Sequence, residues 1–128
     1  MKNIAIEGTK YTPEIKSDIQ KGEIKFYGSS YPENANEFYQ PVYDWVDKYF
    51  EQDGNKALTV NFFIYYFNTS TSKCFMNLLE ILENNHKKGK KITVNWHYSE
   101  DDEDSLDSGE KLFMEIDVDF KLIPVNKI

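Results

Sequence analysis

Residues 57–67 read Ala-Leu-Thr-Val-Asn-Phe-Phe-Ile-Tyr-Tyr-Phe, and this stretch decides the fold that the sequence predicts. The run is rich in β-branched and aromatic side chains, which favour strands, and it becomes almost continuously apolar towards its end. A strand that is covered on both of its faces has this composition. We therefore expect residues 57–67 to form a central strand of a sheet.

The chain before this strand predicts a hairpin and a first helix. Residues 3–7 and 23–27 are expected to be short strands, and Lys21-Gly22 indicates a turn just before the second of them. Ser30 followed by Glu33 three residues later fits a capping box, so a helix is expected to begin there. Pro41 falls inside that helical pattern and predicts a kink or an irregular first turn.

The chain after this strand predicts a second helix, two strands and a short third helix. The polar run over residues 68–72 leads into the second helix, and Asn68, Thr69 and Ser70 are all candidates for its cap. The helix closes at Lys87-Lys88-Gly89, because cations and a glycine are typical of helix C-termini. The remaining expected elements are a strand over residues 91–98, an acidic loop over 100–104, a short helix over 108–115 and a last strand over 120–125. Alternating strands and helices predict a single α/β domain over residues 1–128, with an open, mixed and largely parallel sheet flanked by helices.

Composition narrows the function. The chain has 128 residues and a net charge of -7, from 22 acidic and 15 basic residues. The negative electrostatic field of such a chain repels phosphate backbones and anionic membrane surfaces, so neither nucleic acid nor membrane is an expected partner. With one cysteine, Cys74, and no apolar run of signal-peptide length, the chain is expected to act in the cytoplasm.

Catalytic signatures are scarce. The glycines are scattered singly rather than grouped in a phosphate-binding loop, and no cofactor is expected. One alternative hypothesis is a small enzyme or ligand-binding domain that uses His97 and the carboxylates of residues 100–104 around a divalent metal. The preferred interpretation of residues 100–104 is a solvated acidic loop, followed by a docking patch for a basic partner, because the run lacks the alternating ligand spacing and the glycine of a calcium loop. The leading expectation therefore includes no catalytic residue and no metal.

The segment Asn68-Thr69-Ser70 has a more specific interpretation. It lies where a central strand is expected to turn into a helix, at the edge where open α/β sheets place functional groups. A helix start offers unpaired N–H groups and a positive dipole end, and it suits both a capping hydroxyl and a phosphate. The residues alone leave open whether these hydroxyls only cap the helix.

Several motifs together resemble a known family. Residues 28–34 (GSSYPEN) resemble the SYPEN signature of the SiaC family of regulatory phosphoproteins. Residues 65–73 (YYFNTSTSK) resemble that family's N-T-S stretch at a helix start, and Trp96-His97-Tyr98 followed by the acidic run also matches its layout. The similarity runs from about Ile6 to Ile123, over nearly the whole chain.

The resemblance implies a fold similar to the STAS domain of anti-sigma-factor antagonists. It also implies a non-catalytic switch served by a cognate kinase and phosphatase, whose unphosphorylated form activates a diguanylate cyclase and thereby favours biofilm formation. The family's phosphorylated threonine falls on Thr69, with Ser70 and Thr71 as alternatives. Because the first helix also starts at a functional-looking turn, the predicted docking surface comprises Tyr31, Glu33, Asn34, Asn68, Thr69 and Ser70.

Overall fold

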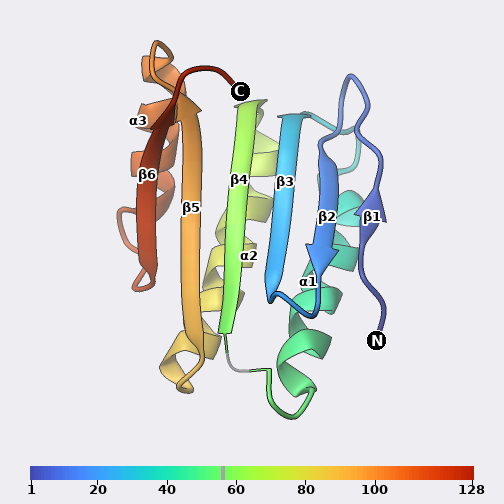
Figure 1. Cartoon of the computed structure of the whole chain (residues 1–128). Coiled ribbons are helices and arrows are strands. Elements are labelled where there is room, and N and C mark those ends of the chain that lie inside the picture. Colours follow the sequence, from blue (N-terminus) through green and yellow to red (C-terminus); the bar gives the residue numbers. More distant parts are fainter. Residues whose placement is uncertain (56) are drawn as a thin grey trace.

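The computed structural model describes residues 1–55 and 57–128. Within these residues the chain forms a six-stranded sheet and three helices (Figure 1). The strands are β1 (Ala5–Ile6), β2 (Glu14–Asp18), β3 (Glu23–Ser30), β4 (Ala57–Phe67), β5 (Lys91–Ser99) and β6 (Asp119–Val125). The helices are α1 (Ala35–Glu51), α2 (Thr69–Lys87) and α3 (Glu103–Phe113).

The sheet is mixed and open, as predicted, and the strands follow one another in chain order. β1, β2 and β3 pair antiparallel, whereas β3, β4, β5 and β6 pair parallel. The predicted turn at Gly22 joins β2 to β3 with a φ of +67°, which glycine adopts without strain. β2 was not predicted, because its residues are polar apart from Ile15, which is the one buried residue of the strand.

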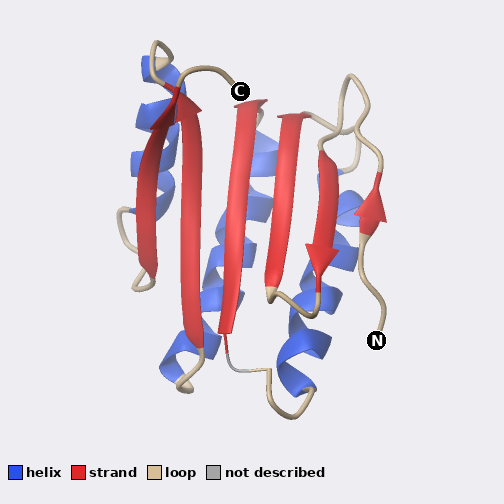
Figure 2. Cartoon of the chain, in the orientation of Figure 1, coloured by secondary structure: helices blue, strands red, loops and turns tan. Residues whose placement is uncertain are grey.

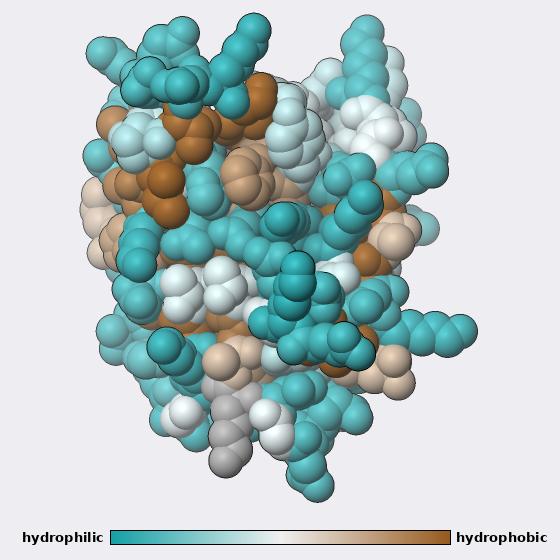
Figure 3. All heavy atoms as spheres, viewed as in Figure 1, coloured by the Kyte–Doolittle hydropathy of each residue, from teal (hydrophilic) through white to brown (hydrophobic). Residues whose placement is uncertain are grey.

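All three helices cover the same face of the sheet (Figure 2). Strand order never reverses from β3 to β6, so right-handed crossovers place every connecting helix on one side. In β4 the side chains of Leu58, Val60, Phe62 and Ile64 are buried against these helices. The expectation that β4 is covered on both faces is wrong, since Phe63 is half-buried and Tyr65 exposed on the other side, which we call the open face. Hydrophilic residues cross the middle of the open face (Figure 3).

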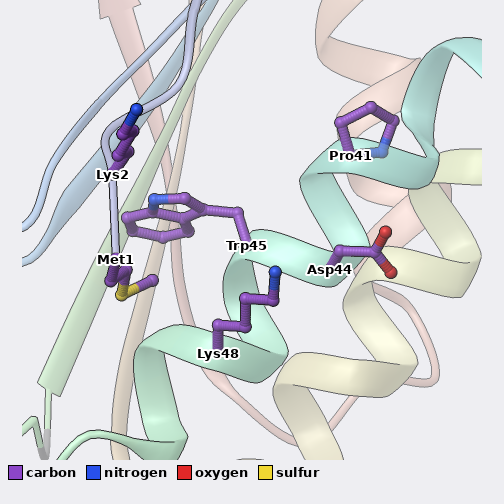
Figure 4. Close-up of a pocket in the computed structure, with 6 residues that line it drawn as sticks. All are labelled: Met1, Lys2, Pro41, Asp44, Trp45 and Lys48. Carbon is purple, nitrogen blue, oxygen red and sulfur yellow. The ribbon is translucent and has the colours of Figure 1, made fainter.

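α1 begins later than predicted. Ser30 is the last residue of β3, and Asn34 caps the helix by accepting a hydrogen bond from the Glu37 N–H at 3.1 Å. The predicted capping box is therefore wrong. The helix continues through Pro41, which lies in its second turn and on the helix ribbon in Figure 4.

α2 and the strands that follow agree with prediction, and α3 does not. Gly89, just beyond α2, has a φ of +96°, as a helix-ending glycine should. α3 begins at Glu103 rather than at residue 108, with the Asp102 carboxylate accepting from the Ser105 N–H at 3.0 Å. Part of the expected acidic loop is thus a helix start, where carboxylates favour the dipole.

One buried core lies between the sheet and the helices. Its largest enclosed side chains include Trp96, Tyr39, Phe26, Phe62 and Phe75. Across the part of the chain that the structure describes, the helices are all too short or too polar to cross a membrane.

Candidate functional site

The candidate site lies at the sheet edge where β3 and β4 end and α1 and α2 begin (Figure 1). Thr69 is the first residue of α2, and both Thr69 and Ser70 are exposed. The Asn68 side chain caps the helix by accepting from the Thr71 N–H at 3.0 Å. Because Asn68 supplies the cap, the hydroxyls of Thr69 and Ser70 are available at the helix start.

Thr71 has the opposite environment. Its side chain is 0% exposed, and its Oγ1 lies 2.8 Å from Ser30 Oγ and donates to the Ser30 carbonyl at 3.1 Å. A modifying enzyme would have to unfold the helix start to reach this hydroxyl. The structure therefore argues against Thr71 as the modified residue and leaves Thr69 and Ser70.

Ser30 joins the two helix starts. Its Oγ lies 2.7 Å from the buried hydroxyl of Tyr39 on α1, and its carbonyl accepts from the Asn68 N–H at 3.1 Å. Burial raises the pKa of Tyr39, so this phenol stays protonated and can donate to Ser30. The chain of hydroxyls fixes α2 against the end of β3, which holds Thr69 in place at the surface.

The predicted docking residues from the first turn lie at the same sheet edge. Tyr31 packs edge-on against Tyr66, the next-to-last residue of β4, with ring centroids 5.9 Å apart. Glu33 and Asn34 are exposed and follow in the loop that leads into α1, where Asn34 serves as the cap. The structure thus brings Tyr31 directly to the end of β4, whereas Glu33 and Asn34 extend the surface towards α1.

A β-bulge adds an aromatic feature that the sequence reasoning missed. The β3–β4 register shifts between Gly28 and Ser29, and Gly28 adopts a φ of +126° that favours glycine. The extra residue in β4 leaves consecutive tyrosines, Tyr65 and Tyr66, exposed by 43% and 57%. Alternation should have buried one of the two, so an unbroken aromatic pair before a predicted helix start was the available signal.

The tyrosines also interact across the open face. The Tyr65 hydroxyl donates to the Tyr27 hydroxyl at 2.7 Å. Burial, followed by this hydrogen bond, raises the pKa of Tyr65 to about 12. The Tyr65 phenol is therefore neutral at physiological pH. Both tyrosines present an apolar ring with a polar tip, a combination enriched at protein interfaces.

The structure gives no support to the alternative metal site. His97 lies on the open face of β5, stacked on Phe63 at 4.0 Å, with Nε2 3.1 Å from the Asn61 amide oxygen. Partial burial, together with Lys25, lowers its pKa. Asp102 is occupied as a helix cap, and no group of three or more His, Cys, Asp or Glu side chains in residues 1–55 and 57–128 is arranged to hold a metal ion.

Fold and site together define a class: a small α/β protein that presents hydroxyl groups at the exposed start of a helix, beside a surface rich in tyrosine. A family model for the SiaC family of regulatory phosphoproteins matches residues 6–125, and the chain belongs to this family. The resemblance carried by residues 28–34 and 65–73 is confirmed. The protein is accordingly a regulatory phosphoprotein and not an enzyme.

Similar proteins come from Pseudomonas aeruginosa. An uncharacterized protein of strain UCBPP-PA14 is 40% identical over 98 residues, which is 77% of each chain. SiaC of Pseudomonas aeruginosa superposes with a TM-score of 0.90 at 32% identity, covering 98% of this chain and 100% of that one. A chain in the crystal structure of the diguanylate cyclase SiaD in complex with its activator SiaC gives a TM-score of 0.90 at 33% identity, covering 95% and 99%.

Proposed function

We propose that this chain, acting as one regulatory domain over residues 1–128, is a protein-binding switch controlled by phosphorylation of Thr69. In the unmodified state the surface formed by Tyr31, Glu33, Asn34, Asn68, Thr69 and Ser70 docks a protein partner. A cognate kinase adds the phosphate and a phosphatase removes it. Family membership supports a phosphorylated state, and the exposed position of Thr69 at the start of α2 is the observation that carries the choice of residue.

Physical chemistry explains why phosphorylation would release the partner. A phosphate adds a charge of about -1.5 to -2 and three strong acceptor oxygens. The N-terminal N–H groups of α2 stabilise that charge within the free protein. A partner that packs closely over Thr69 would have to desolvate the dianion, which costs several kcal/mol where no cation faces it. The modified form is therefore stable alone and unfavourable in the complex.

The proposed partner is a diguanylate cyclase, so the switch would control cyclic-di-GMP and, through it, biofilm formation. Support comes from the SiaD–SiaC complex, in which a protein 33% identical to this chain is the activator of such a cyclase. We place the switch in the cytoplasm, because a protein kinase draws its phosphate from nucleoside triphosphates there.

The test uses the partner that co-purifies with this chain from its native host, together with the host's kinase. We compare the wild-type protein with Thr69→Ala, Thr69→Asp and the matched control Ser70→Ala. Thr69→Ala should lose kinase labelling and keep partner affinity, whereas Thr69→Asp should weaken binding by roughly 10-fold or more, equivalent to about 1.4 kcal/mol. Ser70→Ala should behave like wild type in both assays.

If neither Thr69 variant changes affinity or labelling, the assignment to Thr69 is wrong. Loss of labelling in Ser70→Ala alone would move the site to Ser70. A chain that no cognate kinase can label would contradict the switch itself.

A further inference from the structure

A groove of about 710 Å³ lies next to the docking surface, between β1, the loop after it and the loop that leads into α1. Its apolar lining includes Ile6, Tyr11, Pro32 and Phe38. Tyr11 is 54% exposed. The groove therefore offers apolar surface that the fold itself leaves uncovered.

The groove is continuous with the surface around Thr69. Tyr31 forms part of its wall, and the Tyr31 ring contacts both Tyr11, at 5.3 Å between centroids, and Tyr66, at 5.9 Å. Tyr11, Tyr31 and Tyr66 thus form a row from the groove towards the start of α2. A partner that covers Thr69 can reach the groove along this row.

The loop that forms one wall is held by its own hydrogen bonds. The Thr9 hydroxyl accepts from the N–H groups of Tyr11 and Thr12, at 3.1 and 3.0 Å, and the Tyr31 N–H donates to the Tyr11 carbonyl at 2.8 Å. These bonds fix the position of Tyr11 before any partner arrives. A preformed groove binds without the entropic cost of ordering a loop.

The charges on the groove indicate what it binds. Glu7 and Glu33 both line it and are exposed, and its lining residues in the described part of the chain include no Lys or Arg. Neither carboxylate forms a salt bridge with any residue that the structure describes. Lys10 is a neighbour outside the lining, with Nζ 6.0 Å from the Tyr11 ring centroid. The groove therefore combines an apolar lining with two carboxylates that have no cation of their own.

We propose that this groove binds a partner segment in which an apolar side chain is flanked by Lys or Arg. The apolar side chain would fill the space between Tyr11, Pro32 and Phe38, and the flanking cations would face Glu7 and Glu33. The proposal rests on the proposed function, because it assigns this segment to the docking partner. The proposal agrees with release by phosphorylation, because Thr69 does not line the groove. The partner's cations would lie in the groove, and an uncharged part of the partner would cover Thr69.

The test measures binding of short labelled peptides to the whole chain. The first peptide carries a leucine pair flanked by lysines; a second has glutamates in place of the lysines, and a third has serines in place of the leucines. The protein variants are the double substitution Glu7→Lys with Glu33→Lys and a matched control, Glu110→Lys with Glu115→Lys. The control makes the same change in net charge on exposed residues of α3 and the turn after it.

The lysine peptide should bind and shift the amide NMR signals of Tyr11, Tyr31 and Phe38. Its affinity should fall as salt is added. The glutamate and serine peptides should bind far less. The Glu7/Glu33 variant should lose roughly 10-fold in affinity, because two attractive charge pairs become repulsive, and the control should lose little. Circular dichroism of both variants checks that the fold is intact.

Signal shifts elsewhere on the protein, or equal losses in the two variants, would overturn the groove proposal. The labelling and affinity of the Thr69 variants do not depend on that result. If the groove proposal is wrong, the proposed switch is unaffected. If the proposed switch is wrong, the peptide-binding result still holds.

Discussion

Thr69 and Thr71 lie two residues apart, yet their hydroxyls have opposite environments. The helical turn carries Thr69 outward into solvent and Thr71 inward onto Ser30, where it is fully buried. At the residue scale, the site combines exposed hydroxyls at the start of α2 with a buried hydroxyl that fixes the backbone behind them. Each can be tested by substitution without disturbing the other.

Thr71→Val should destabilise the protein by about 1–3 kcal/mol, because Ser30 would lose a buried hydrogen-bond partner. Urea unfolding followed by circular dichroism measures this loss, and Thr69→Ala serves as the exposed control, with an expected change within about 0.5 kcal/mol. Kinase labelling of folded Thr71→Val should persist. Loss of labelling without loss of stability would indicate instead that Thr71 is itself modified.

His97 predicts a pH dependence of stability. Partial burial and Lys25 hold its folded pKa below the ordinary value of about 6.5, so the unfolded chain binds a proton more readily. The contribution of His97 to the free energy of unfolding is fully present above the unfolded pKa. It is lost as the pH falls towards the lower, folded pKa. Between about pH 7.5 and pH 5, wild type should lose more stability than His97→Gln, as measured by urea midpoints. Parallel losses would show that His97 does not titrate differently on folding.

At the scale of elements, α3 depends on one glycine. A Cβ at Gly109 would lie 2.6 Å from Trp96 of β5, whose indole N–H donates to the Ser105 carbonyl at 3.0 Å. In an open helix Gly→Ala stabilises by up to about 1 kcal/mol, whereas here we expect a net loss of about 1–3 kcal/mol from overpacking. Thermal unfolding of the Gly109→Ala protein, with Ser108→Ala as the control, measures this loss of stability. A stabilised Gly109→Ala protein would show that α3 shifts freely on the sheet.

Local sequence patterns predicted most helices and strands. They failed where contacts between residues distant in the sequence determine the structure. The stretch at 57–67 and the helix that follows it were found because apolar spacing and end signals are local properties. Ser30 and Glu33 matched a capping box, but β4 recruits Ser30 into the sheet and moves the helix start to Asn34. β4 was expected to be covered on both faces because aromatic residues on its open face concealed the alternation.

The same distinction applies to the site. The segment around Thr69 could be placed at a helix start from sequence, because a strand followed by hydroxyl residues and an apolar helical pattern indicates one, whereas the choice of Thr69 came from the family resemblance. The groove could not be placed, since it forms only when the loop around Tyr11 folds onto the loop around Tyr31. The exposure of Tyr66 depends on the β-bulge opposite Gly28, and the only local sign of that bulge is the pair of consecutive tyrosines at residues 65 and 66.

At the scale of the whole molecule, the strand order of the sheet, which follows the chain, gives its two faces different surroundings. The three helices cover one face and contain the core, while the open face and the edge at the start of α2 remain accessible (Figure 1). A chain that already carries a net charge of -7 becomes still more acidic when phosphorylated. A phosphate on Thr69 would add its charge at the start of α2 and not across the whole surface, so its effect on docking would be local.

The central claim is that a phosphate on Thr69 weakens docking. Its most direct test is a calorimetric titration of the co-purified partner against protein phosphorylated only at Thr69, verified by mass spectrometry, with unmodified protein in parallel. We predict that the phosphorylated protein binds about 10-fold more weakly or worse, and that phosphatase treatment restores the original affinity. Equal or tighter binding by the phosphorylated protein would contradict the account.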